Sequence, residues 1–126
     1  MVTLTIEGRL PGLNEYTGAC RSNKYIGAKM KKETEELIGW YIKAQLKDTH
    51  FDAPVGLVFR WYETNKKRDL DNIAFAKKFI LDALVKNGII KTDGWKGVAG
   101  FTDEFYIDDR ARVEMDIMLT GGKNDD

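Results

Sequence analysis

Apolar and polar residues alternate at both ends of this chain, and this alternation limits the fold more than any other feature. Segments 2–7 and 113–119 each carry an apolar residue at every second position. A period of two places all of these apolar side chains on one face of a β-strand. We therefore predict a strand at each end of the chain, with one face buried and the other exposed.

The middle of the chain alternates between helical and strand-like patterns. Apolar residues follow a helical period from about residue 24 to 47 and again from about residue 70 to 87, where Gly88 is a typical helix stop. After Pro54, VGLVFRWYET is rich in β-branched and aromatic residues, and FTDEFYI at 101–107 is also typical of a strand. Two helices and four strands are therefore expected.

The remaining segments contain turn-forming residues. PGLNEYTGACRSN, at 11–23, is expected to form a long loop, and IIKTDGWKG, at 89–97, a turn region. The predicted order is β-α-β-α-β-β, which indicates a single α+β domain with a mixed sheet and two main helices. We assign this domain to residues 1–120 and expect a polar tail at 121–126.

Several classes of protein are excluded by what the chain lacks. Its 126 residues suit one domain with a modest core, and no apolar run approaches the roughly 18 residues that span a bilayer. A single cysteine, Cys20, and a single histidine, His50, allow neither an internal disulfide nor a His/Cys zinc site. No glycine-rich nucleotide-binding motif is present. We expect a cytoplasmic protein with no membrane partner and no nucleotide cofactor.

The charges are balanced in number but sorted along the chain. There are 20 basic and 20 acidic residues, so a nucleic-acid partner is not indicated by the net charge. Binding responds to the local potential, however, and Lys66, Lys67 and Arg68 form a basic run directly beside two aspartates. Such a run is either a solvated loop or a contact for a phosphate backbone.

Asp69 and Asp71 stand at the predicted start of the second helix and have two interpretations. Carboxylates at this position can cap free N–H groups and meet the favourable end of the helix dipole. They can also bind Mg²⁺, a hard ion that takes one or two protein carboxylates together with water and substrate phosphate. Asp-x-Asp alone does not decide between the two, because the pattern occurs often by chance.

Three further polar residues gather around this predicted helix. At 100° per residue, positions 71, 78 and 82 fall within roughly 40° of one another, so Asp71, Lys78 and Asp82 share a stripe. Lys78 can extend toward the aspartates and stabilise charge on a phosphate, or form a solvated pair with Asp82. Asp93, in the turn after the helix, is either a further carboxylate of the site or an ordinary Asp-Gly turn residue.

The ordered combination of these motifs resembles a known family. RDLDN at 68–72, LDALVKNG at 81–88 and an aspartate five residues later, together with FTDEF, are similar to the RusA family of Holliday-junction resolvases, and in particular to its phage and prophage members. The likeness covers roughly residues 2–120. It implies a small homodimeric endonuclease of a bacterial or phage-infected cell, which uses Mg²⁺, with Mn²⁺ as a substitute, to cut four-way DNA junctions by symmetric paired nicks.

The resemblance also implies a catalytic and metal-binding set, Asp69, Asp71 and Asp93, together with a catalytic lysine. Well-known members place that lysine four residues after the second aspartate, where this chain has Phe75. Counting back from LDAL, and following the helical stripe, both favour Lys78. Lys77, which faces roughly 120° away from Asp71, is assigned to DNA binding with Lys66, Lys67 and Arg68. The displaced lysine leaves two alternatives open, a nuclease for flaps or other branched DNA and an inactive junction-binding protein.

Overall fold

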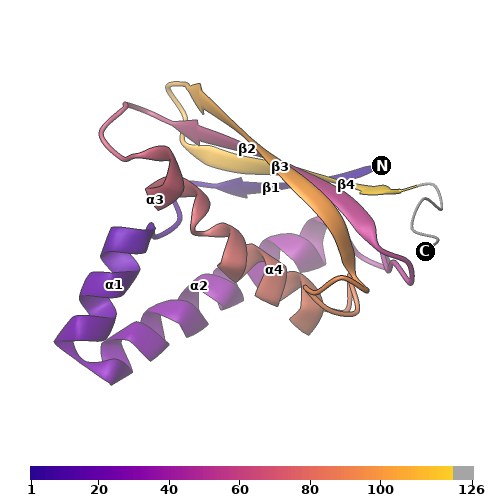
Figure 1. The fold of residues 1–126 in the computed structure, drawn as a ribbon, viewed down its shortest axis with the longest axis horizontal. Coiled ribbons are helices and arrows are strands. Elements are labelled where there is room, and N and C mark those ends of the chain that lie inside the picture. Colours follow the sequence, from indigo (N-terminus) through magenta and orange to yellow (C-terminus); the bar gives the residue numbers. More distant parts are fainter. Residues whose placement is uncertain (121–126) are drawn as a thin grey trace.

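The computed structural model describes residues 1–120 as a four-stranded mixed sheet with helices packed on one face (Figure 1). The predicted tail at 121–126 lies outside these residues. The strands are β1 (Val2–Glu7), β2 (Val55–Glu63), β3 (Val98–Ile107) and β4 (Arg112–Leu119), and the helices are α1 (Leu13–Ser22), α2 (Lys24–Gln45), α3 (Leu70–Ala74) and α4 (Lys77–Lys86). The α+β class and the mixed sheet are confirmed, and the strands follow the predicted order along the chain.

The sheet has the order β1-β4-β2-β3. β4 pairs antiparallel with both β1 and β2, whereas β2 and β3 are parallel and are connected through α3 and α4. A parallel pair needs such a crossover because a short turn cannot return the chain to the same end of the sheet. The connection places the segment that follows β2 at one end of the sheet, beside the last residues of β3.

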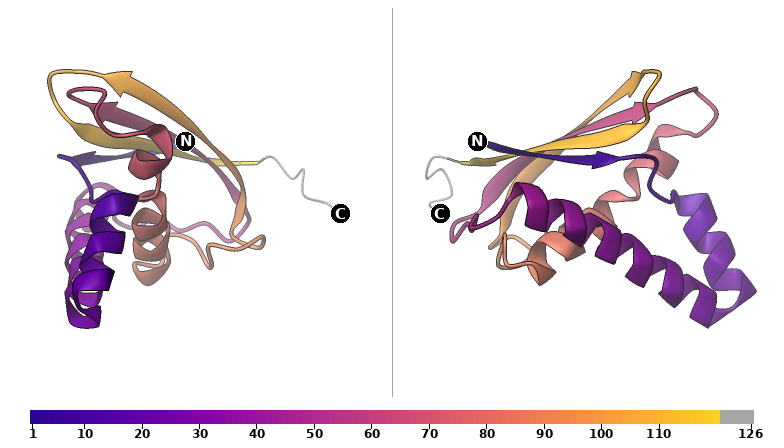
Figure 2. Two further views of the ribbon diagram at one scale, coloured as in Figure 1. Left: turned by 60° about the vertical axis from the view of Figure 1, so that its left-hand side comes forward. Right: turned by 180° about the vertical axis from the view of Figure 1, so that it is seen from behind.

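The core lies between the sheet and the helices. The strands contribute the alternating residues that the sequence pattern selected, including Leu4, Phe59 and Met115, each of which is fully buried. α2 and α4 contribute Ile38 and Ile80 to the same core. Figure 2 shows from two further directions that the helices all lie on one side of the sheet. Nothing in residues 1–120 forms a helix that is long and apolar enough to cross a membrane.

The expected long loop at 11–23 is wrong, because most of it forms α1. Gly12 occupies the N-cap position, and its backbone N–H donates a hydrogen bond to the Glu15 carboxylate over 3.0 Å. α1 then packs against α2, where a Cβ on Gly27 would lie only 2.5 Å from Cys20 Sγ. Gly12, which indicated a loop, thus serves as a helix cap, and Gly27 of α2 permits the close helix–helix approach.

The helix expected at 70–87 is interrupted at Phe75 and Ala76, between α3 and α4. The backbone N–H groups of Ala76, Lys78 and Phe79 each donate to the carbonyl three residues earlier, which tightens the chain at this point. Phe75 meets Tyr16 of α1 with ring centroids 5.6 Å apart, and it meets Phe79 at the same distance. Phe75 is therefore a packing residue that joins α1 to α4.

Candidate active site

Two exposed carboxylates stand where β2 leads into α3. Asp69 takes the N-cap position with an extended backbone, but its side chain makes no capping hydrogen bond. Asp71 lies in the first turn and accepts a hydrogen bond from its neighbour Asn72 N–H over 3.0 Å. Arg68, the adjacent cation, pairs with Glu63 and Glu15 instead. The capping interpretation of Asp69 is therefore not supported, and its carboxylate is free to meet a ligand.

Arg68 fixes the position of this segment. Its guanidinium donates to both carboxylate oxygens of Glu63, over 3.2 and 2.7 Å, and also to the carbonyl of Leu10 over 3.2 Å. Both partners of the ion pair are covered, since only 11% of the Arg68 side chain and 9% of the Glu63 side chain are exposed. A forked pair of this kind is geometrically specific. Arg68 thus holds the end of β2 to the chain that precedes α1.

The start of α1 also docks on the aspartate segment. The Asn72 side-chain oxygen accepts a hydrogen bond from the Asn14 N–H over 3.0 Å. A Cβ at Gly12 would lie 2.5 Å from the same oxygen and 2.8 Å from an Arg68 nitrogen. Only glycine leaves room for this approach. The aspartates are consequently held on a rigid base made by β2, α3 and α1.

Lys78 and Asp93, two predicted catalytic residues, lie together although they are far apart in the sequence. The Lys78 ammonium is 2.8 Å from the Asp93 carboxylate and 3.2 Å from that of Asp82. The hydrogen bond to Asp93, followed by that to Asp82, raises the pKa of Lys78, and the same bond lowers the pKa of Asp93. Lys78 is therefore held as a cation, with 57% of its side chain exposed.

Asp82 connects Lys78 to a charge cluster around the buried Glu35, between α2 and α4. Lys31 lies 3.6 Å from Asp82 and 2.8 Å from Glu35, whose side chain is almost fully covered. Lys86 of α4 binds the other oxygen of Glu35. Burial alone would raise the pKa of Glu35, but the hydrogen bonds from Lys31 and Lys86 outweigh it and the pKa is lowered. The network fixes α4, and with it the backbone of Lys78, against α2.

Lys77, the neighbour of Lys78, points to a different region. Its ammonium donates to Asp103 over 2.6 Å and lies 3.8 Å from the centre of the Phe101 ring. Asp103 also accepts a hydrogen bond from the Trp61 indole over 2.9 Å, and only 14% of the Lys77 side chain is exposed. Arg68 and Lys77 were both predicted to contact DNA, but each is engaged within the fold. Lys66 and Lys67, by contrast, are exposed beside Asp69.

The donor types at Asp69 and Asp71 suit a divalent ion. Mg²⁺ commonly takes one or two carboxylates and completes its shell with water and phosphate. Over residues 1–120, however, no three carboxylate, histidine or cysteine side chains gather closely enough to hold a metal. Asp69 and Asp71 therefore remain as two exposed carboxylates at the start of α3, whereas Asp93 lies with Lys78.

A cavity of about 360 Å³ opens beside Asp69. Its polar wall comes from the segment that contains the basic run, and its apolar wall comes from α3 and the end of β3. The residues that line it are Glu63, Asn65, Lys66, Arg68, Asp69, Leu70, Ile73, Phe105, Tyr106 and Ile107. Exposed carboxylate, ammonium and apolar groups thus meet at one concave surface, as is typical of a binding site.

An α+β scaffold with exposed aspartates and lysines at the start of α3, and a paired lysine and aspartate at α4, fits a phosphodiester-cleaving enzyme. Residues 11–118 match the family described as Endodeoxyribonuclease RusA. Because this match covers most of the chain, the protein belongs to the RusA endodeoxyribonuclease family, whose enzymes act on branched DNA junctions. No curated protein matches the sequence.

Sequence reasoning missed the partners that hold the site in place. Glu63 and Asp103 both bind predicted DNA-contacting cations, and neither was singled out. For Glu63 a signal exists: it follows Leu57, Phe59 and Trp61 at the same period of two, which puts a carboxylate on the buried face of β2. A buried carboxylate needs a cation, and Arg68 lies five residues away.

Proposed function

We propose that this protein is a Mg²⁺-dependent resolvase that cuts four-way DNA junctions by paired, symmetric nicks. The family membership gives the endonuclease class and the branched substrate. The observation that most supports the assignment of the site is the 2.8 Å pair between Lys78 and Asp93, which joins two residues that were selected separately. Asp69, Asp71, Asp93 and Lys78 are the proposed catalytic residues.

In this proposal Asp69 and Asp71 hold the metal, which is assigned as Mg²⁺ with Mn²⁺ as a substitute. When bound, the ion would lower the pKa of the water that it coordinates and would neutralise charge on the phosphate. The donor set supports the assignment, because two exposed carboxylates with one residue between them leave the remaining coordination positions for water and phosphate.

The other residues orient the DNA and stabilise charge. Lys78 carries a positive charge at an exposed position, where its ammonium, oriented by Asp82 and Asp93, can approach a phosphate oxygen. Such a preorganised cation stabilises charge that develops during the reaction. Lys66 and Lys67 lie beside Asp69 and are proposed to contact the DNA backbone, which positions the strand without reading its sequence.

A homodimer is proposed because productive resolution needs two matched cuts. One small domain with one site cuts a single strand, and two-fold symmetry supplies a second identical site. Two copies of the Lys66–Lys67 pair would then face one junction.

The deciding experiment uses an end-labelled synthetic four-way junction with Mg²⁺, Mn²⁺ or EDTA, beside matched flap and linear duplexes. We expect symmetric nicks in opposite strands with either ion and none with EDTA. Preferential cleavage of the flap would instead indicate a different branched-DNA nuclease. A plasmid cruciform separates paired from single nicks, since wild type should linearise it and heterodimers with Asp71→Asn in one subunit should leave nicked circles.

A further inference from the structure

The corner between α1 and α2 carries charge of one sign along the chain. Residues 16–32 contain five cations and no acidic residue, within a chain that has no net charge. The five are Arg21, Lys24, Lys29, Lys31 and Lys32. A surface with one sign of charge creates a strong local potential even where the total charge is zero. We call this region, residues 21–32, the hairpin tip.

Four of these cations are free to meet a partner. Lys31 is engaged with Glu35 and Asp82. The other four are exposed, and in the part of the chain that the structure describes none of them forms an ion pair. Their charge is therefore not used to stabilise the fold.

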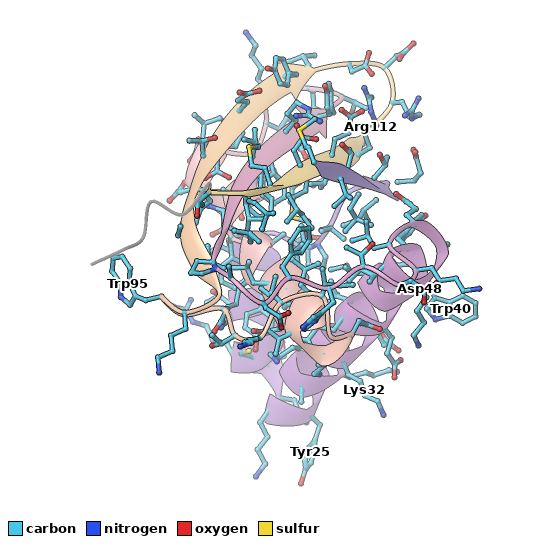
Figure 3. All side chains as sticks on the ribbon, turned by 90° about the vertical axis from the view of Figure 1, so that its right-hand side faces the viewer. Tyr25, Lys32, Trp40, Asp48, Trp95 and Arg112 are labelled. Atoms are coloured by element: carbon cyan, nitrogen blue, oxygen red, sulfur yellow. The ribbon has the colours of Figure 1, made fainter. Side chains whose placement is uncertain are left out.

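The hairpin tip projects from the body of the molecule. Figure 1 shows α1 and α2 diverging from the sheet and meeting at a corner away from it. Figure 3 shows Tyr25, in the first turn of α2, extending away from the body of the protein, and 71% of this residue is exposed. The close approach of Gly27 to Cys20 holds the two helices together near the corner. The tip is thus a firm projection and not a loose loop.

The other end of α1 is anchored at the candidate active site through Asn14, Asn72 and Arg68. Ten helical residues extend for about 15 Å. Along one strand of DNA, phosphates are spaced by about 3.4 Å of helix axis, so this length corresponds to about four or five base pairs. The hairpin therefore has the length to link a cut phosphate to the backbone of the same DNA arm.

We propose that the hairpin tip is a second DNA-binding surface, which holds the phosphate backbone of one junction arm about four to five base pairs from the cut. Lys24, Lys29 and Lys32 are the main contacts. The contact is electrostatic and independent of sequence, as expected for lysines that meet phosphates. The proposal rests on the proposed active site at Asp69 and Asp71 for its distance, and on the charge and exposure of the tip for its ligand.

The test measures binding of a fluorescent four-way junction by anisotropy in EDTA, over a series of KCl concentrations. The variant Lys24→Gln/Lys29→Gln/Lys32→Gln removes three charges from the tip. The control, Lys43→Gln/Lys47→Gln, removes two lysines at and just after the opposite end of α2, and the losses are compared per charge removed. Thermal unfolding checks that both variants are folded.

We expect the tip variant to bind at least about tenfold more weakly at low salt, and the slope of log K against log salt to fall by roughly 2.7, or about 0.9 for each lost phosphate contact. The control should stay within about twofold of wild type. An unchanged slope in the tip variant, or an equal loss in the control, would overturn the proposal.

A second measurement locates the contact on the DNA. Neutral methylphosphonates are placed about four to five nucleotides from the mapped cut, or at an equal number of positions about ten nucleotides away. The nearer set should weaken DNA binding by wild type but should not weaken binding by the tip variant further. The neutral phosphates and the lysine substitutions remove the same contacts. If the losses of binding free energy from the DNA change and from the protein change were additive, they would contradict the proposed position. Binding in EDTA does not depend on cleavage, so failure here is distinct from failure of wild type to resolve junctions.

Discussion

Two regions around α3 and the first turn of α4 contain similar groups but treat them in opposite ways. In the closed region, Lys77, Asp103 and the Trp61 indole are joined by hydrogen bonds under the Phe101 ring. In the open region, Lys78 and Asp93 are paired but are 57% and 35% exposed, and Asp69 and Asp71 are exposed as well. The contrast indicates that covered, fully paired charges serve stability, whereas accessible charges remain for a substrate.

The largest expected effect comes from replacing one aspartate by asparagine in each region. Asp71→Asn should lower junction cleavage on the order of 10³-fold, because it removes a charge that the metal needs, while binding stays intact or tightens. The unfolding temperature should stay within about 2 °C of wild type, since surface substitutions change stability by about 0.5 kcal/mol at most. Single-turnover cleavage and calorimetry measure the two quantities.

Asp103→Asn is the control for that exchange. It should unfold at a lower temperature, because Lys77 loses its carboxylate partner in a covered position, and the folded protein should still cleave. Wild-type cleavage by Asp71→Asn would remove that residue from the site.

The next effect separates the adjacent lysines. Lys78→Ala should lower turnover on the order of 10²-fold, the scale for losing one preorganised cation near the reacting phosphate. Its stability should change little because the side chain is mostly exposed. Single-turnover rates at saturating protein give this value, and the proposed role fails if turnover is normal.

Lys77→Ala should instead lower stability and change turnover little. Asp103 would keep only the Trp61 indole as a partner, which should lower the free energy of unfolding by about 1–3 kcal/mol. Urea denaturation measures this loss. A Lys77→Ala protein with unchanged stability and slow turnover would move the catalytic role from Lys78 to Lys77.

The smallest effect concerns pH. Lys78 lowers the pKa of Asp93, so this carboxylate contributes stability above its ordinary pKa and loses it as the pH falls through the lowered value. Lys78 has a raised pKa, so its contribution to stability depends on pH in the opposite sense. That contribution is present below the ordinary lysine pKa and is lost as the pH rises through the raised value.

The exposed pair is worth a few tenths of a kcal/mol at neutral pH. The stability difference between wild type and Lys78→Ala should therefore shrink as the pH falls well below about 4. Unfolding free energies over a pH series provide the check, and a difference that stayed constant in acid would argue against the pair.

Local patterns were sufficient for most secondary structure. The period of two identified β1 and β4, and the β-branched and aromatic content identified β2. The helical period identified α2, and Gly88 ends α4 with a positive φ of 72°. α1 was missed because Gly12 and Gly18 lower helix propensity, and propensity cannot register packing against Gly27. The interruption at Phe75 was missed for a similar reason, since it accompanies contacts with Tyr16 of α1.

The sequence was enough to select the residues of the candidate site, but it was not enough to identify the partners of those residues. Spacing within one helix was enough to predict that Lys78 meets Asp82, four residues later. Spacing did not reveal that Arg68 binds Glu63, or that Lys77 binds Asp103. Those contacts depend on tertiary structure, since Glu63 ends β2 and Asp103 lies within β3.

By itself, the sequence determined the α+β class, the buried faces of the strands and the cluster of charges around Asp69 and Asp71, because each follows from the period or spacing of nearby residues. Only the tertiary structure decided which charges remain available. The parallel pairing of β2 with β3 brings Asp103 to Lys77, and the turn before β3 brings Asp93 to Lys78. A helix places adjacent side chains about 100° apart, so one lysine faces the sheet while the next stays exposed.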